Sequence, residues 1–517
     1  MAAFKLMPGP KGLPLIGNAL TYSRFGKHDF ERMHLAKMEY LEKYGTIYRE
    51  CMGPGVNIVQ VFDPKDIEKI FRSDGRLPVR PPLPITITAA KREGLPLGLG
   101  SLNGEDWYQL RKSVQRVMMH PRAASVYLPV QNAVADDFLE IIERNIRDGK
   151  LLDFEDIILR YTMESIGTVC FDTRLGCLEA RSSESDFGIA NQMVKATTNI
   201  FQAAQKTTFA FPWYVLFRTH NYRQFVNGKK VSNRQHCPSK HLECPKQMPC
   251  HGHPTKHNYR ARRGGPRSRP QLPADLSQQE TLTSQQVTGI VTDLFTAGID
   301  STANAMCFVL YNLSKHNRAQ DILAEEIQRV IPKGQPVTQE TFDKMPYMKA
   351  CVKESFRMNF PIEGGTTRIL QKDVTLGGYQ VPKGTMVAMN NQTMCIQDQY
   401  FSNPGSFLPE RWLKGQIQFD KVASPFIMLP FGHGARMCIG RRFAEQEIYL
   451  AVIKIFREFK VSHNSSEEVG MVNRIFTVPD RPLELTFEPR TQRSATPCGQ
   501  DRKHPSTETD ISANIAQ

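Results

Sequence analysis

The chain has 517 residues, of which 40% are hydrophobic and 23% charged, as expected for a globular protein with a large core. Its net charge of +14 does not indicate nucleic-acid binding, because residues 229–270 alone hold eleven Lys and Arg against a single acid, Glu243. No apolar run reaches the roughly 18 residues of a membrane-spanning helix, and the first five residues are too short for a signal peptide. Eleven cysteines without a paired framework favour a reducing compartment.

The order of predicted elements indicates a mainly helical protein with a small β-rich part. Residues 8–18 form a Pro- and Gly-rich lead-in that excludes helix, and short strands follow from 47 to 61. A second group of short strands is predicted over 366–389, with turns at its Gly-Gly and Pro-Lys-Gly sequences. Helical periodicity marks the ranges 136–146, 153–170, 284–316, 319–331, 349–358 and 441–456.

Two early segments carry side chains of interest. Trp107 and Arg111 are four residues apart, so a helix would place both on one face, where the simplest interpretation is a stacked Trp–Arg pair. Residues 209–217 are strongly apolar and are broken by Pro212. This segment suits either a loop that dips into a membrane surface or the buried start of a helix.

Residues 232–275 differ in composition from everything around them. They concentrate three Cys and five His among Pro, Lys and Arg, without helical periodicity. These are metal-ligand types, but their spacing matches no paired C-x-x-C arrangement. Apolar residues are too few to offset the entropy of ordering, so we predict a disordered interruption here and a disordered polar tail over 491–517.

The long predicted helix at 284–316 has a capping box at Thr283-Ser284-Gln285-Gln286 and a polar centre. The centre reads Ala297-Gly298-Ile299-Asp300-Ser301-Thr302, and a mid-helix Gly costs about 1 kcal/mol relative to Ala. One interpretation is a local opening of the helix where an acid and a hydroxyl relay protons. The other is an ordinary polar face or a helix–helix contact.

Three charged residues suggest an ion-pair network. Glu354 and Arg357 are three residues apart on one predicted helix and can pair, which on its own most often means a surface ion pair. Arg411 lies in the sequence Pro409-Glu410-Arg411-Trp412, shortly before the most informative part of the chain.

That part is the run Phe431-Gly432-His433-Gly434-Ala435-Arg436-Met437-Cys438-Ile439-Gly440. Its glycines allow the backbone to wrap closely around Cys438 and to point N–H groups at the sulfur. Such a cysteine suits a thiolate ligand to haem iron, which favours cleavage of an O–O bond. Phe431 is expected to pack near the sulfur, and Arg436 has the charge to hold a haem propionate. A glycine-rich turn with a buried thiol is the simpler alternative.

This run resembles the haem-binding loop of the cytochrome P450 family, F-x-x-G-x-R-x-C-x-G, at every fixed position. The polar helix centre resembles the family's A-G-x-D-T-T pattern, with Ser301 in place of the relay threonine, and Glu354 to Arg357 resembles its E-x-x-R motif. The resemblance covers roughly residues 8–231 and 282–490. It implies one haem-thiolate unit over 1–490, interrupted at 232–275, with the mainly helical cytochrome P450 fold.

The resemblance also implies roles for individual residues. Cys438 binds the iron of haem b, iron protoporphyrin IX, and Asp300, Ser301 and Thr302 are the catalytic residues that deliver protons. Glu354, Arg357 and Arg411 form a buried structural network. The expected cofactor-binding residues beside Cys438 are Trp107, Arg111, Arg368, Arg436, Phe431 and Gly432.

Lys349 and Lys353, with Arg441 and Arg442, resemble the cations with which mitochondrial members of the family dock a [2Fe-2S] ferredoxin, itself reduced by an NADPH-dependent reductase. Ordinary solvated lysines are the alternative. The resemblance implies a monooxygenase that uses O2 on a lipophilic, sterol-, steroid- or secosteroid-like substrate, at the matrix side of the mitochondrial inner membrane and in peripheral contact with it. A catalytically impaired haem-binding protein, or an isomerase or peroxide-using enzyme that does not activate O2, are the alternatives.

Overall fold

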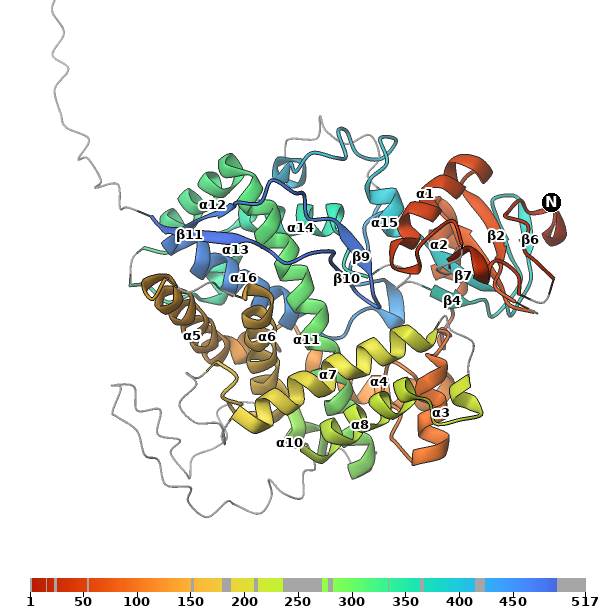
Figure 1. Cartoon of the computed structure of the whole chain (residues 1–517), viewed down its shortest axis with the longest axis horizontal. Coiled ribbons are helices and arrows are strands. Elements are labelled where there is room, and N and C mark those ends of the chain that lie inside the picture. Colours follow the sequence, from red (N-terminus) through yellow and green to blue (C-terminus); the bar gives the residue numbers. More distant parts are fainter. Residues whose placement is uncertain are drawn as a thin grey trace, which may run out of the picture.

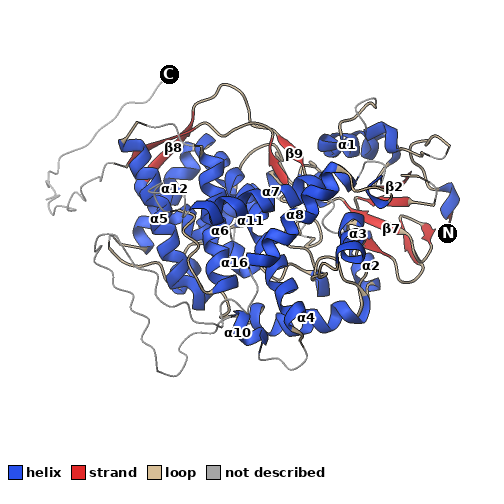
Figure 2. Cartoon of the chain, turned by 60° about the horizontal axis from the view of Figure 1, so that its bottom comes forward, coloured by secondary structure: helices blue, strands red, loops and turns tan. Residues whose placement is uncertain are grey.

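The computed structural model describes most of the chain and leaves several segments outside its description. The described residues are 2–14, 16–22, 26–53, 55–149, 153–178, 187–208, 213–235, 272–277, 282–332, 334–362, 367–413 and 424–490. Helices make up most of the molecule, and the majority of the strands gather at one end of it, where the N-terminus also lies (Figures 1 and 2). This confirms the mainly helical fold with a small β-rich part.

The β-rich end contains the sheet that the sequence predicted in two pieces. β2 (Ile47–Cys51) and β3 (Asn57–Val61) form an antiparallel hairpin in which Ile47 lies opposite Val61. β7 (Met386–Met389) runs parallel to β3, and β4 (Thr367–Ile369) completes the order β2-β3-β7-β4. A smaller sheet joins β1 (Ala2–Ala3), β6 (Tyr379–Val381) and β5 (Val374–Leu376). Two further pairs lie elsewhere: β9 (Met471–Asn473) with β10 (Thr477–Pro479), and β8 (Phe459–His463) with β11 (Leu485–Pro489).

The helical part is built around one long central helix. α11 (Ser284–Lys315) begins with the expected capping box, in which the Thr283 side chain accepts from the Gln286 N–H. It passes through the middle of the molecule, and its central and C-terminal residues are buried over most of their surface (Figure 1). α6 (Phe154–Phe171) packs along it, and α5 (Leu128–Arg147), α12 (Asn317–Val330), α14 (Pro346–Met358) and α16 (Arg441–Glu458) contribute to the same core. The predicted helices are therefore confirmed within a few residues at most ends.

A second layer of helices covers one side of α11. α7 (Phe187–Thr208) and α8 (His220–Gln235) pack against each other and against α3 (Pro84–Glu93), as Figure 1 shows. Ile85, Ile200 and Phe225, one from each helix, belong to one buried apolar cluster. Periodicity alone did not identify α3 or α7. The remaining helices are α1 (Met33–Tyr44), α2 (Pro64–Ser73), α4 (Gly104–Met118), α10 (Leu272–Ser277), α13 (Gln339–Asp343) and α15 (Asn391–Cys395).

The unusual basic segment is described only at its two edges. Residues 232–235 are the last residues of α8, and residues 272–275 belong to α10, so these edges are helical where the composition predicted irregular chain. Residues 236–271, with all of the Cys and His noted above, lie outside the described residues, as does the tail 491–517. Among the described helices, none combines the length and the apolarity that crossing a bilayer requires.

Candidate haem-binding site

The Cys438 loop adopts the wrapped conformation that its glycines allow. Gly432 and Gly434 have φ angles of 70° and 72°, in the left-handed region that residues with a side chain rarely adopt. A short 3-10 turn over Gly434–Arg436 follows, and the Cys438 N–H donates to the Phe431 carbonyl over 2.8 Å. The loop therefore closes on itself just before α16 begins at Arg441.

Opposing effects act on the pKa of the Cys438 thiol. Burial raises the pKa of its thiol, while the N–H groups of Gly440 and Arg441 and the guanidinium groups of Arg111 and Arg80 act to lower that pKa. The side chain is nevertheless exposed to a cavity of about 250 Å³, which the loop, the end of α4 and the start of α16 line. Two backbone donors and two cations around one sulfur are the surroundings that favour a thiolate ligand.

Four arginines gather on the same side of the molecule as Cys438. The Ile369 N–H donates to the Val79 carbonyl over 3.0 Å, which brings the adjacent Arg80 and Arg368 together. Burial lowers the pKa of Arg80 to about 10, with repulsion from Arg368 next in importance. Burial also lowers the pKa of Arg436 to about 9, again with help from neighbouring arginines. Asp74 faces this group, and its carboxylate accepts from Arg368 over 2.8 Å.

This cluster fits a group that carries carboxylates. The Nε of Arg80 and the Nη2 of Arg368 are buried, and neither finds a hydrogen-bond partner among the described residues. Buried cationic donors without a partner are costly, and crowded guanidinium groups repel one another. Two propionates would supply the missing acceptors and negative charge, since guanidinium groups bind carboxylates well. The residues present therefore fit a haem beside Cys438.

The predicted propionate residues occupy this region in different ways. Trp107 and Arg111 both lie on α4 and are buried, as their spacing predicted. Arg111 donates to the Met437 carbonyl over 2.9 Å. Arg436 stacks over the Trp107 ring at 3.7 Å, but its nitrogens donate to protein oxygens, including the Leu102 carbonyl at 2.9 Å. In this structure Arg436 thus joins the loop to the chain before α4 and has fewer donors to spare than expected.

Sequence reasoning missed Arg80. Its Nη2 donates to the Arg436 carbonyl over 2.8 Å, so it touches the Cys438 loop directly. In the sequence it lies between Pro78 and Pro81, in a stretch with no periodicity and no motif that we used. The half-buried position of this arginine depends on contacts with chain segments hundreds of residues away, and the local sequence contains no sign of them.

The polar centre of α11 has features of both interpretations given for it, a proton relay and a helix–helix contact. A Cβ at Gly298 would lie 3.0 Å from Ile166 on α6, so this glycine permits close helix packing. The Ser301 hydroxyl donates to the Ala297 carbonyl over 2.6 Å, which is the back-bonding that often bends a helix. Thr302 is buried. Asp300 is different, because burial raises the pKa of its carboxyl from 3.8 to about 7.

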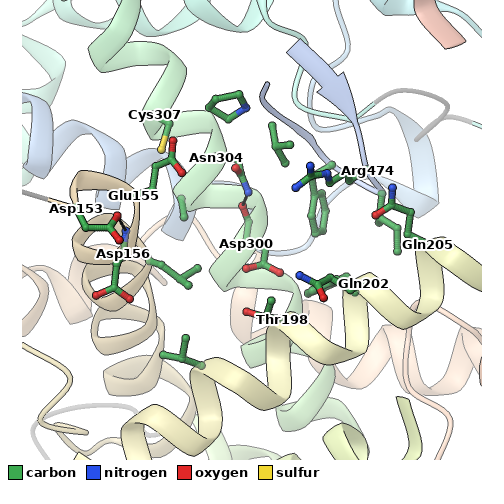
Figure 3. A pocket seen from close by; sticks show the side chains of 18 residues that line it. Asp153, Glu155, Asp156, Thr198, Gln202, Gln205, Asp300, Asn304, Cys307 and Arg474 are labelled. Carbon is green, nitrogen blue, oxygen red and sulfur yellow. Dashed lines mark hydrogen bonds between the residues drawn. The ribbon is translucent and has the colours of Figure 1, made fainter. Parts of the chain in front are cut away.

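Asp300 faces a polar cavity of about 450 Å³ between α6, α7, α11 and the β9–β10 turn (Figure 3). Figure 3 shows Thr198 and Gln202 of α7 on one side of Asp300, and Glu155 of α6 on the other. Burial also raises the pKa of Glu155, and its Oε1 has no hydrogen-bond partner among the described residues. A carboxyl with a pKa near neutrality beside a polar cavity is suited to exchanging protons with water.

Glu354 is the centre of a buried network. It and Arg357 have no exposed side-chain surface, and Arg357 binds it through two nitrogens, with Nε–Oε2 at 2.9 Å and Nη2–Oε1 at 2.8 Å. Arg411 adds a contact at 3.0 Å, and the indole of Trp412 donates to Glu354 over 2.9 Å. Arg357 further donates to the carbonyls of Cys395 and Pro404. The pair is therefore not the surface ion pair that the spacing alone favours.

Three of the four candidate docking cations lie around one cavity beside the Cys438 loop. Lys349, Lys353 and Arg441 line it, whereas Arg442 lines the neighbouring cavity that contains Cys438. The described end of the apolar 209–217 segment forms an exposed turn. Trp213 and Phe217 are 54% and 63% exposed, while residues 209–212 lie outside the described residues.

Comparison with known proteins supports the same assignment. The family model for cytochrome P450 matches residues 7–487. The chain is 31% identical over 491 residues to cytochrome P450 10 of Lymnaea stagnalis, covering 94% of this chain and 86% of that protein. It is 32% identical over 488 residues to the mitochondrial 1,25-dihydroxyvitamin D(3) 24-hydroxylase of Mus musculus, covering 94% and 89%. It is 29% identical over 497 residues to the mitochondrial cytochrome P450 302a1 of Drosophila melanogaster, covering 95% and 96%.

The fold, the cysteine loop, the cluster of buried cations and the family match over nearly the whole chain all agree. The chain therefore belongs to the cytochrome P450 family, whose members are monooxygenases that bind haem through a cysteine thiolate.

Proposed function

We propose that this protein is a mitochondrial monooxygenase that hydroxylates a lipophilic substrate of the sterol, steroid or secosteroid class with electrons from a [2Fe-2S] ferredoxin. The observation that carries the proposal is the carboxyl of Asp300, whose pKa is raised to about 7 beside a polar cavity. An enzyme that reduces O2 needs protons at neutral pH, whereas an isomerase does not. Asp300 is suited to that supply.

We assign a separate role to each group of residues in the site. Cys438 is assigned as the iron ligand, with Phe431 and Gly432 shaping its loop. Bound there, the haem would supply O2 activation, so that one oxygen atom enters a substrate C–H bond and the other leaves as water. The propionates are assigned to the cations and the tryptophan beside the loop, namely Arg80, Arg111, Arg368, Arg436 and Trp107. Asp300 holds and transfers protons, and Ser301 and Thr302 follow it directly on α11.

The substrate class rests on the apolar layer over α11 and on the relatives. α3, α7 and α8 form an apolar cluster, and Ile475, in the turn between β9 and β10, packs against it. A cover of this kind suits a lipophilic molecule with few polar groups. One relative of similar length is named a 24-hydroxylase of 1,25-dihydroxyvitamin D(3). We extend the class of that substrate, and no particular compound, to this chain.

The location rests on the names of relatives and on one exposed surface. Two of the relatives above are named mitochondrial. The turn Trp213–Phe217 exposes Trp213, Leu216 and Phe217, and Arg92 of α3 donates to the carbonyls of Tyr214 and Val215 behind it. Exposed aromatic and aliphatic side chains on a braced turn suit the interface of a bilayer. We therefore place the protein at the matrix side of the mitochondrial inner membrane, in peripheral contact with it.

Reconstitution tests the electron donor. The purified protein, a [2Fe-2S] ferredoxin, its NADPH-dependent reductase and a panel of sterols and secosteroids should give a hydroxylated product and a substrate-induced shift of the haem spectrum. Lys349→Glu and Lys353→Glu should weaken ferredoxin binding, and the loss should be larger at low than at high ionic strength, because salt screens exposed charges.

Haem content should stay unchanged in both variants, since neither lysine contacts the cysteine. Full turnover with a diflavin reductase and none with ferredoxin would contradict the mitochondrial assignment. Turnover that needs no reductant would instead indicate a peroxide-using enzyme or an isomerase.

A further inference from the structure

Glu155 is a half-buried acid to which the assignments above give no role. It lies in the first turn of α6 and lines the same cavity of about 450 Å³ as Asp300 (Figure 3). Its Oε1 atom is buried and has no hydrogen-bond partner among the described residues. A buried carboxyl oxygen without a partner is unfavourable, so a partner from outside the chain is required here.

Water fits this cavity better than a metal ion does. One water molecule occupies about 30 Å³ in the liquid, so the cavity has room for several. Polar side chains that can hold water line its wall, namely Gln202 and Gln205 of α7 and Asn304 of α11. Among the described residues no three His, Cys, Asp or Glu side chains are grouped to hold a metal ion, and the cation Arg474 lines this same cavity.

The cavity reaches the surface at the beginning of α6. Asp153 is exposed, the side chain of Asp156 is 37% exposed, and both line the cavity. Figure 3 shows these two residues at the left of the cavity and Asp300 at its centre. Glu155 is on the same turn of α6 as the two surface residues, but its Oε1 is buried. It therefore lies between solvent and Asp300.

The spacing along α11 gives the distance that a proton would travel. Asp300, Asn304 and Cys307 are four and three residues apart and all line the cavity, so they form one stripe on the helix. Burial, and after it the charge of Glu155, raises the pKa of the Cys307 thiol, which places Glu155 at the Cys307 end of this stripe. That end is about 10 Å along the helix from Asp300. About three waters can bridge such a gap, whereas a direct hydrogen bond cannot.

The surroundings of Glu155 suit a group that gains and loses protons. Burial raises the pKa of its carboxyl, and Asp153 adds to this effect, while the N–H of Leu483 and the charge of Arg474 act to lower that pKa. α7 contributes no titratable residue to the cavity lining. The other titratable side chains that line the cavity are Asp156, Asp300 and Cys307.

We propose that Glu155 is a second proton-transfer group, which takes protons from solvent at the α6 end of the cavity and passes them through water to Asp300. Each step moves one proton from oxygen to oxygen and transfers no electron. Glu155 regains from solvent the proton that it releases, and Asp300 gains the proton that it then delivers. This inference deepens the proposed function and rests on it, since a reaction that reduces O2 consumes protons.

The first test measures turnover in the complete system with saturating ferredoxin. Glu155→Gln keeps the size of the side chain but removes the acid, so it should lower turnover about tenfold and raise the solvent isotope effect on turnover about twofold. Glu155→Asp remains an acid and should keep turnover within about threefold of the wild type. Glu340→Gln is the matched control, because it makes the same change in the first turn of α13 and lines no part of the cavity. It should change neither quantity.

The second test needs no turnover. The infrared carboxyl band of Asp300, identified by its absence in Asp300→Asn, shifts when its proton exchanges with D2O. In the resting holoenzyme, at a pH below the Asp300 pKa of about 7, Glu155→Gln should slow this exchange about tenfold and Glu340→Gln should leave it unchanged. A crystal structure of the wild-type holoenzyme should also contain ordered waters that join the two carboxyl groups.

The outcomes separate this route from the proposed function. A wild-type protein that forms no product with reductant and O2 contradicts the proposed function, while the exchange rate still decides the route. Equal exchange rates in the wild type and in Glu155→Gln overturn the route, whatever the turnover. Equal losses of turnover in Glu155→Gln and Glu155→Asp also overturn it, because shape and not acidity would then matter. If Glu155→Gln loses haem, a wild-type crystal structure without water between the carboxyl groups overturns the route.

Discussion

The surroundings of Cys438 explain how its thiol, which is open to the neighbouring cavity, can serve as a metal ligand. Burial alone raises its pKa and keeps the proton on sulfur. The N–H groups of Gly440 and Arg441 and the charge of Arg111 work in the opposite direction. A bound iron would complete the shift, because a coordinating thiol is deprotonated. The loop therefore prepares a ligand that needs the metal to become a thiolate.

Replacing this cysteine gives the most direct prediction. Cys438→His should abolish the red-shifted Soret band that the reduced protein with carbon monoxide owes to a thiolate, even if the imidazole retains some haem. Absorption spectra of the two proteins check this. Cys177→Ser is a suitable control, because Cys177 is buried outside the loop, in an apolar cluster with Met163 and Val169 of α6. A band that survives the histidine substitution would show that another residue binds the iron.

Asp300 gives a prediction about pH. With a pKa of about 7, its carboxyl is mostly protonated below pH 7 and mostly ionised above it. Turnover should therefore show an ionisation near pH 7, and Asp300→Asn, which cannot exchange protons, should remove it and lower turnover about 100-fold. Pre-steady-state and steady-state rates from pH 5.5 to 9 would measure this. An unchanged pH profile in the variant would remove Asp300 from proton delivery.

The same residue affects stability in a predictable direction. Its pKa in the folded protein lies above the 3.8 of an ordinary Asp, so the folded state holds the proton more tightly than the unfolded state. Stability from this group is therefore present at low pH and declines as pH rises from about 4 towards 7. The melting temperature of Asp300→Asn should lack that part of the decline.

Some pairs of elements are joined by buried polar contacts in addition to the apolar core. The network around Glu354 links α14 to residues 395–412, with two guanidinium groups on one carboxylate. The contribution of this network to stability is clearest when one partner is removed, because a buried charge without its counter-charge is very unfavourable. Close apolar packing joins α6 to α11, where Gly298 leaves room for the side chain of Ile166.

Glu354→Gln is therefore expected to destabilise the protein. The amide keeps the size of the side chain but leaves Arg357 and Arg411 without their counter-charge, at a cost of about 3–5 kcal/mol. Lower haem occupancy and a lower unfolding midpoint in urea would be the readouts. Glu488→Gln, at an exposed position on β11, removes the same charge and should change neither quantity measurably. A stable, fully loaded Glu354→Gln protein would contradict this structural role.

The whole molecule places distinct surfaces on different sides of the central helix. Glu93 at the end of α3 pairs with Arg218 and Lys230, both at 3.0 Å, so the exposed turn, α3 and α8 are joined as one cover. The apolar turn lies on this cover, whereas the cavity lined by Lys349, Lys353 and Arg441 lies between α14 and α16. In the proposed function, membrane contact and electron transfer would therefore use different surfaces.

The exposed turn Trp213–Phe217 leads to a prediction about membrane binding. Phe217→Glu should lower the fraction of protein that sediments with vesicles containing anionic lipid, since it places a charge in an apolar contact. The haem spectrum should not change. Thr486→Glu is the control, because β11 lies at the far end of the molecule (Figure 1). Equal loss of sedimentation in both variants would mean that general charge, and not this turn, governs binding.

The sequence by itself determined the features whose chemistry is local. The glycines around Cys438, the capping box at Thr283 and the pairing of Glu354 with Arg357 each depend on residues close in the chain, and the structure contains all three. The burial of that pair does not follow from its spacing. Periodicity likewise predicts the six helices α5, α6, α11, α12, α14 and α16, whereas the other described helices, α3 and α7 among them, were identified only in the structure. Asp300 and Ser301 on α11 also belong to one short motif. The raised pKa of Asp300, however, cannot be read from that motif.

Only the tertiary structure decided the rest. Arg80 meets Arg436 and Arg368 across about 290 to 360 positions of sequence, and the raised pKa of Asp300 comes from its burial among other elements. The cover made by α3, α7 and α8 and the cavity between α14 and α16 have the same origin. Each depends on contacts between segments that are distant in the chain, and burial and proximity of this kind leave no periodic trace in the residues themselves.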